Sequence, residues 1–190
     1  MMRYYLIRIV PLVLALLVVM GGFWGLKWWK DKKLSELSYQ EYEIRRAIQS
    51  GDYKRADELI KKIQADDSPY KPLVLSYRLY LEKEEGIKVD EVQILQDLIS
   101  SLKDKDIVPL YKERLAYAYY LVGNNQKALE LLNNIGKDSF NYYSAQILKG
   151  MVLEKMGKKD QAKEVYTQVE KLAKGTYFGN LAGALLMEER

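Results

Sequence analysis

The 190-residue sequence contains no cysteine and no histidine. Without cysteine the chain has no disulfide and no thiolate nucleophile, and cysteine usage leaves its redox compartment open. Without histidine the usual zinc sites, Ser-His-Asp triads and imidazole acid–base chemistry are excluded. An enzyme would have to use carboxylates, lysine or hydroxyl groups alone, and no carboxylate pair or Gly-rich loop stands out at a catalytic spacing. We therefore expect a binding protein and not an enzyme, with no catalytic residues, metal, cofactor or small-molecule substrate.

The net positive charge of the chain lies in its N-terminal region. The net charge of the chain is +4, yet residues 1–33 carry six lysines and arginines against Asp31, a balance of +5. The remaining residues therefore sum to −1. A body without a basic patch lacks the electrostatic signature of nucleic-acid-binding proteins, so we expect no nucleic-acid partner.

The chain has one long apolar run, the charge-free stretch "IVPLVLALLVVMGGFWGL" of residues 9–26. As a helix it would be about 27 Å long, close to the hydrocarbon thickness of a bilayer. Tyr4 and Tyr5 precede the run, and Trp24, Trp28 and Trp29 surround its end. Aromatic rings favour the two headgroup regions of a membrane, so these five residues predict two interfaces. We expect residues 1–33 to form a membrane anchor with one transmembrane helix.

The anchor is predicted to be retained. A cleaved signal peptide ends in small residues of the A-x-A type, whereas here Gly21 and Gly22 are followed by the bulky Phe23 and Trp24. Gly21 and Gly25 have the G-x-x-x-G spacing that allows another membrane helix to approach, although glycines are also tolerated near an interface. The count of lysines and arginines on each side of the run slightly favours a cytoplasmic body, but short N-terminal tails weaken this rule, and it leaves the orientation open.

The remaining sequence is repetitive. Three stretches, "GDYKRADELI", "GNNQKALELL" and "GKKDQAKEVY", place a glycine five positions before an alanine; the pairs are Gly51 with Ala56, Gly123 with Ala128 and Gly157 with Ala162. The glycine is expected to end a helix in a left-handed turn, and the alanine to lie where a neighbouring helix crosses. A degenerate unit with Val92 at the alanine position gives spacings of 36, 36 and 34 residues. Periods of this length are typical of tetratricopeptide repeats.

The predicted fold is therefore all-α, with the N-terminal transmembrane helix followed by a tetratricopeptide-like helical-repeat domain of residues 34–190. Four helix pairs are expected near residues 35–65, 69–103, 106–135 and 139–173. A last helix over residues 177–187 would cover the exposed edge of the final pair. The best unit resembles the repeat consensus through Gly150, Gly157, Ala162 and Tyr166, but the units lack its tryptophan and closing proline.

The whole arrangement resembles a known family. The N-terminal span, the collar "WWKDKK" of residues 28–33, the stretch "YEIRRAIQSGDYKRADELIKKI" and the degenerate repeats are similar to the ancillary subunit of the bacterial Sec translocon, a tetratricopeptide-like family. The resemblance implies a single-pass protein of the bacterial inner membrane with its body in the periplasm. It also implies translocon subunits, periplasmic chaperones and secretory clients as partners. The alternatives are an adaptor facing the cytoplasm, which the collar lysines favour, and a regulatory subunit of a membrane enzyme.

Aromatic residues provide the candidate binding surface. In helical repeats the first helices of successive pairs line a concave groove. By the repeat register, Tyr117 and Met151 fall at equivalent groove positions, Tyr120 lies one turn after Tyr117, and Tyr80 is one residue short of the matching position in its unit. We expect these four residues to form a peptide-docking strip, the alternative being that they are ordinary core or surface residues.

Overall fold

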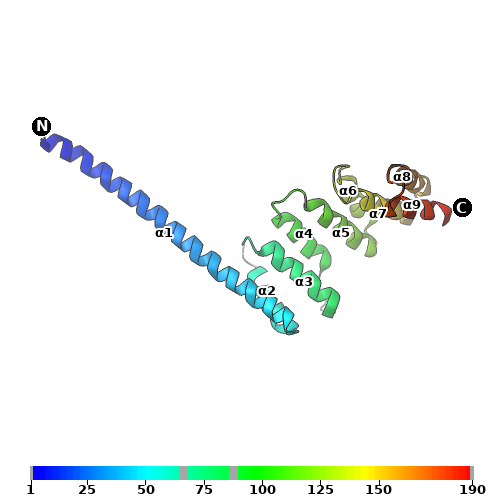
Figure 1. Cartoon of the computed structure of the whole chain (residues 1–190), viewed down its shortest axis with the longest axis horizontal. Coiled ribbons are helices and arrows are strands. Elements are labelled where there is room, and N and C mark those ends of the chain that lie inside the picture. The colour runs from blue at the N-terminus through cyan, green and yellow to red at the C-terminus, as the bar shows by residue number, and fades with distance from the viewer. Residues whose placement is uncertain (1, 65–67, 86–89, 189–190) are drawn as a thin grey trace. The chain divides into compact units, whose positions relative to one another are not determined.

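The computed structural model describes the backbone of residues 2–64, 68–85 and 90–188, and the side chains of residues 16–63, 68–81 and 90–188. Within these ranges the chain forms nine helices and no strand (Figure 1). The helices are α1 (Met2–Gln49), α2 (Tyr53–Gln64), α3 (Lys71–Glu85), α4 (Glu91–Ser101), α5 (Val108–Leu121), α6 (Asn125–Asn133), α7 (Tyr142–Lys155), α8 (Lys159–Leu172) and α9 (Tyr177–Glu188). The all-α class, the four helix pairs and the final helix are therefore confirmed.

Three of the helix pairs turn at the predicted glycines. Gly51, Gly123 and Gly157 have φ values of 74°, 81° and 75°. At Gly123 the main-chain N–H donates to Tyr120 O (3.2 Å), and the next N–H, of Asn124, donates to Tyr119 O (2.8 Å). The other two turns contain the same two hydrogen bonds, which together define the Schellman motif. The left-handed conformation favours glycine because glycine has no Cβ, so the predicted role of these residues is confirmed.

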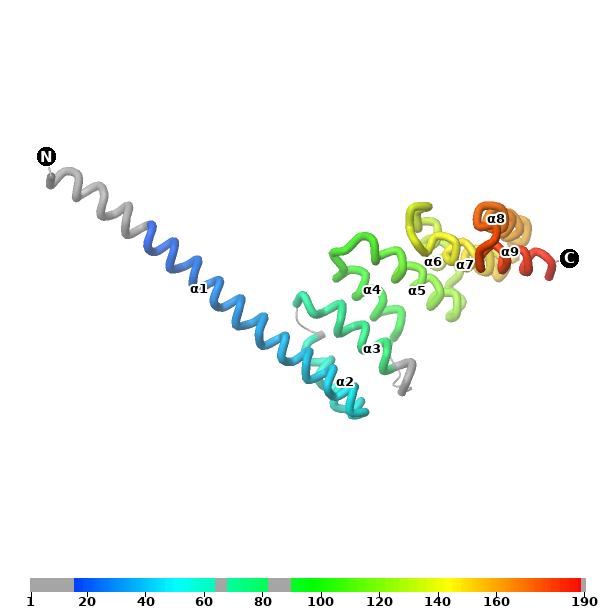
Figure 2. Tube along the Cα trace, in the orientation of Figure 1, coloured from blue at the N-terminus to red at the C-terminus, as the bar shows by residue number. Residues whose placement is uncertain are grey.

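The chain divides into two compact units, Met1–Tyr70 and Lys71–Arg190. The first unit contains α1, a single helix of 48 residues. The coloured part of α1 in Figure 2 continues unbroken into the first repeat. Its last turns pack against α2, and Arg55 of α2 forms an ion pair with Glu43 of α1 (2.9 Å). The predicted boundary between residues 33 and 34 falls inside this continuous helix and stays a prediction.

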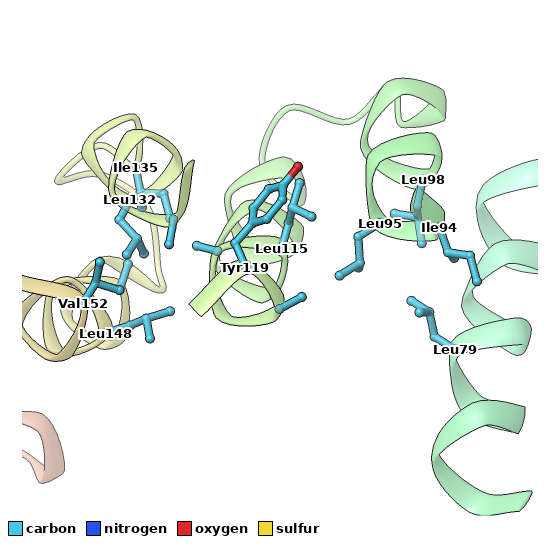
Figure 3. Close-up of a cluster of buried hydrophobic side chains, with 14 of the residues drawn as sticks. Leu79, Ile94, Leu95, Leu98, Leu115, Tyr119, Leu132, Ile135, Leu148 and Val152 are labelled. Atoms are coloured by element: carbon cyan, nitrogen blue, oxygen red, sulfur yellow. The ribbon is translucent and has the colours of Figure 1, made fainter. Parts of the chain in front are cut away.

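The second unit is a solenoid of α3 to α9. Each helix packs against the next along the chain, and α7 also contacts both α5 and α9. Leucine and isoleucine side chains from α3 to α7 form one continuous core, and Tyr119 lies among them (Figure 3). Stacking of neighbours is how repeat units, each too small to bury its own apolar face, obtain a common core.

Small residues lie where the helices cross. Ala56, Ala128 and Ala162 are completely buried, as the repeat pattern predicts, whereas Val92 in the degenerate unit is only partly buried. A second core joins α7, α8 and α9 around Tyr166. At this crossing α7 lies directly against the Tyr166 ring, and a Cβ at Gly150 would overlap the ring.

Candidate protein-binding groove

A groove of about 620 Å³ runs along one face of the second unit. It is formed by one face each of α5, α7 and α9 and by the turn before α7. We call it the α5–α7–α9 groove, and its lining residues are Leu110, Glu113, Arg114, Tyr117, Phe140, Asn141, Ser144, Ile147, Leu148, Met151, Tyr177, Phe178 and Leu181. Both α5 and α7 are the first helices of their pairs, so the groove lies on the face where the repeat pattern predicts a binding surface.

The repeat register accounts for most of this lining. Lining positions 110, 113, 114 and 117 of α5 are each 34 residues before lining positions 144, 147, 148 and 151 of α7. The same step takes Ser144 to Phe178 and Ile147 to Leu181 in α9. The last helix therefore acts both as the predicted cover of the final pair and as the first helix of a further, incomplete unit.

Large apolar side chains at the groove remain exposed. The exposed fractions are 73% for Phe140, 73% for Tyr177, 47% for Tyr117 and 42% for Leu110. Tyr177 also makes an edge-to-face contact with Phe178, with ring centroids 5.4 Å apart. Contiguous apolar patches of this kind mark interaction sites on soluble surfaces, and rigid aromatic rings are frequent anchors at protein interfaces.

One carboxylate of the groove lining, that of Glu113, is held by hydrogen bonds. The side-chain amide of Asn141 donates to Glu113 Oε2 (2.6 Å) and to Pro109 O (3.0 Å). Ser144 Oγ lies 3.0 Å from the same Oε2 and 2.9 Å from Asn141 O. Asn141 is only 5% exposed, so its amide is a fixed part of the wall. The arrangement orients the Glu113 carboxylate before any partner arrives.

The other charged lining residue is already paired. Arg114 Nε donates to Glu91 Oε1 of α4 (3.1 Å), an ion pair that links two helix pairs. Within the described ranges, no three Asp or Glu side chains cluster closely enough to hold a metal ion. The groove is thus mainly apolar, with one anchored carboxylate and one neutral ion pair.

The structure brings two of the four predicted groove residues together. Tyr117 and Met151 both line the α5–α7–α9 groove. Tyr120 is not among the lining residues; it packs partly against the core and stacks on Tyr117 with ring centroids 6.2 Å apart. Lys155 Nζ lies 4.3 Å from the centroid of the Tyr120 ring and donates to Tyr120 O (2.9 Å).

Tyr80 lies on α3 and is 43% exposed, but it does not line this groove. The following residue, Leu81, occupies the position that matches Tyr117 and is only 1% exposed. The degenerate unit therefore presents its apolar side chain inward at the matching position and its tyrosine outward beside it. Whether any of the four predicted residues binds a partner stays a prediction.

Sequence reasoning missed several lining residues. Glu113 and Ser144 stand at register positions of the strip and could have been found by extending the 34-residue step beyond Tyr117 and Met151. Phe140 and Asn141 precede α7, and no repeat pattern points to them. Their place in the groove depends on how the turn between α6 and α7 folds back.

A second apolar surface lies on α1. Residues 16–36 are all exposed, and the exposed fractions of Trp24, Trp28 and Trp29 are 70%, 65% and 56%. Lys32 Nζ lies 5.3 Å from the Trp28 ring centroid, and Lys33 Nζ lies 6.0 Å from that of Trp29. The collar is thus a band of indole rings with lysines one turn further along the helix.

The membrane predictions are only partly covered by the structure. In the described part of the chain, no helix is both long and apolar enough to cross a membrane. The predicted span of residues 9–26 begins among residues 1–15, whose side chains lie outside the described residues, as do the predicted interface residues Tyr4 and Tyr5. A Cβ at Gly21 or Gly25 would meet no described atom within 4 Å, and the predicted helix contact at this face stays a prediction.

Comparisons with known proteins agree with this architecture. An uncharacterized protein of Aquifex aeolicus (strain VF5) is 29% identical over 171 residues, which cover 88% of each chain. The crystal structure of TPR-like repeats, nearly identical to one another, from a putative kinesin light chain of Podosopora anserina has a similar fold. Its TM-score is 0.56 at 20% sequence identity, and the match covers 80% of this chain and 84% of the other. A tetratricopeptide repeat protein from Parabacteroides merdae ATCC 43184 has a TM-score of 0.59 and 16% identity over 78% of this chain and 58% of its own.

The family itself is recognised over almost the whole sequence. The tetratricopeptide repeat-like domain matches residues 4–181, a range that includes all four helix pairs and the start of α9. Repeats of this type are typically protein-interaction scaffolds that use the surface created by stacking. We conclude that this chain belongs to the tetratricopeptide repeat-like domain family.

Proposed function

We propose that this protein is a membrane-anchored adaptor that binds segments of other proteins in the α5–α7–α9 groove. The observation that carries the proposal is the groove itself. Its wall is mainly apolar, exposed aromatic rings surround it, and it lies on the first helices of successive repeats. Such rings lose little conformational entropy on binding, because each has only two side-chain torsions to fix.

The exposed apolar surface of α1 supports the membrane part of the proposal. Leucine, valine, methionine and phenylalanine side chains between residues 16 and 26 are about half to three-quarters exposed, and the indole rings and lysines of the collar follow directly. Water is an unfavourable environment for so continuous an apolar surface, whereas lipid tails would cover it and the headgroup region suits the collar.

The resemblance to the ancillary translocon subunit supports a more specific role. On this proposal the protein is a single-pass component of the bacterial inner membrane, and its repeat domain lies in the periplasm. There it would link secretory clients emerging from the Sec translocon to periplasmic chaperones. The competing proposal is an adaptor facing the cytoplasm, which the lysines of the collar favour through the positive-inside rule. A regulatory subunit of a membrane enzyme is the alternative from another class.

Site-specific photocrosslinking in native membranes tests the proposal. A photoreactive phenylalanine analogue is placed at Phe140, an exposed residue of the groove, and separately at Lys163, an exposed residue of α8 outside it. We expect crosslinks to translocon subunits or chaperones, identified by mass spectrometry, from position 140 and not from position 163.

A matched pair of substitutions separates the groove from the rest of the surface. Tyr117→Ala removes a ring from the groove, and Tyr39→Ala removes a similarly exposed ring from α1, where Tyr39 faces Tyr42 as Tyr117 faces Tyr120. Crosslinking from position 140 should fall severalfold in the first variant and stay unchanged in the second. Equal crosslinking in both variants, each folded by circular dichroism, would show that partners do not use this groove.

A further inference from the structure

The charge of the α5–α7–α9 groove identifies the chemistry of its partner. Two of its lining residues, Glu113 and Arg114, are charged. The charge of Arg114 is offset by Glu91 at 3.1 Å. Among the described residues, no lysine or arginine forms an ion pair with Glu113, and its Oε1 accepts no hydrogen bond. The groove therefore carries one unneutralised negative charge within an apolar wall.

This carboxylate is also oriented in advance. Both of its neighbours, the Asn141 amide and the Ser144 hydroxyl, contact Oε2, which leaves Oε1 as the oxygen available to a partner. Asn141 is itself tied to Pro109 O at the start of α5, so the network connects α5 with the turn before α7. A carboxylate held in this way loses little side-chain entropy when it pairs with a cation.

The apolar residues specify what surrounds that cation. The exposed faces of Tyr117, Phe140 and Tyr177 would cover aliphatic or aromatic side chains of the partner. An acidic segment would meet the unpaired Glu113 carboxylate, and like charges in a partly dehydrated groove repel each other. A segment without charge would leave Glu113 without a counter-charge once water is displaced, which is also unfavourable.

We infer that the α5–α7–α9 groove selects apolar protein segments that carry a lysine or arginine positioned to pair with Glu113 Oε1. This inference rests on the proposed function, because it names the partner class of the same groove. The cation supplies the counter-charge, and the neighbouring apolar side chains supply the contact area. Selection arises from the single carboxylate and not from the overall charge of the repeat domain.

Binding of defined peptides to the full chain tests this inference. The chain is placed in zwitterionic lipid nanodiscs, with empty nanodiscs as the blank for peptide bound to lipid. The probes are three short fluorescein-labelled peptides with the same Leu- and Phe-containing core and with Lys, Gln or Glu at one central position. Fluorescence anisotropy should give a Kd for the Lys peptide about tenfold lower than that for the Glu peptide, with the Gln peptide between them.

The variant Glu113→Gln keeps an amide oxygen that can accept the hydrogen bonds of Asn141 and Ser144, but it removes the charge. The preference for the Lys peptide should then fall to within about twofold. In the matched control Glu164→Gln, which removes an exposed charge from α8 outside the groove, the tenfold preference should remain.

Four outcomes would overturn the inference, and they differ in what they say about the groove. If Tyr117→Ala weakens all three peptides equally and the wild-type chain shows no preference among them, the groove binds proteins but does not select a cation. A preference for the Lys peptide that persists in Glu113→Gln would assign the selection to charges elsewhere. If no peptide binds above the empty-nanodisc blank, or if Tyr117→Ala has no effect, the groove assignment of the proposed function fails as well.

Discussion

Substitution of Gly150 by alanine tests the packing of the last complete repeat. Gly150 lies in α7 where the helix crosses α8, and the ring of the fully buried Tyr166 rests against it. A Cβ at position 150 would lie 2.5 Å from Tyr166 Cζ and 2.8 Å from Cδ1, whereas ordinary carbon–carbon contacts begin near 3.4 Å. The ring would therefore have to move by roughly 1 Å within a close-packed site.

Two opposing terms determine the expected magnitude. Alanine favours a helix over glycine by about 1 kcal/mol, and overpacking of a filled core costs about 1–3 kcal/mol. Because the predicted overlap involves several atoms of a rigid ring, we place the cost at the upper end of that range. Gly150→Ala should therefore destabilise the repeat domain by roughly 1–2 kcal/mol in urea denaturation followed by circular dichroism.

The same substitution in a Tyr166→Leu variant shows whether overlap with the Tyr166 ring causes the destabilisation. In a Tyr166→Leu chain the ring is absent, so Gly150→Ala should become neutral or stabilising by up to about 1 kcal/mol. The double-mutant cycle thus has a coupling term of about 2 kcal/mol that belongs to this contact. A wild-type chain that Gly150→Ala stabilises would refute the reasoning, because it would show that the ring does not lie on the α7 backbone.

Three further predictions concern the repeat frame and the membrane. Ala162→Leu should lower the stability of the repeat domain by about 1–3 kcal/mol in the same assay, whereas Lys159→Leu on the exposed side of α8 should change it by less than about 0.5 kcal/mol; equal effects would mean that the helix crossing is misplaced. Gly123→Ala forces a side chain into a turn with φ of 81° and should cost about 1–2 kcal/mol, unlike Gly136→Ala, where φ is not left-handed and the space is open. Lys137→Cys introduces one thiol into the exposed turn before α7; an impermeant maleimide should label it once the outer barrier alone is opened, and labelling only after inner-membrane lysis would favour the cytoplasmic adaptor.

The helix ends were predictable from the sequence because their interactions span only a few residues. Gly51, Gly123 and Gly157 adopt the left-handed turns expected of them. Asn124 and Asp90 then accept hydrogen bonds from the main-chain N–H groups three residues further on, as N-cap residues do.

The repeat period also placed residues correctly where it was regular. It put Ala128 and Ala162 at completely buried positions, because equal spacing returns the chain to equivalent positions of the solenoid. Tyr117 and Met151 both line the groove, and their role in binding stays a prediction. In the degenerate unit, where Val92 replaces the alanine, the position that matches Tyr117 is the buried Leu81, and the neighbouring Tyr80 lies outside the groove.

The composition of the groove was decided by tertiary structure. Tyr120 is one helical turn from Tyr117, yet it packs partly against the core, and Lys155 of the next pair lies over its ring. No pattern in the sequence marks Glu113 as part of a hydrogen-bond network. Only the folded chain brings Asn141 and Ser144, which are 28 and 31 residues away, into contact with it. Contacts of this kind depend on how separate helix pairs are stacked, and the sequence of a single helix contains no information about which side chains its neighbours will bring.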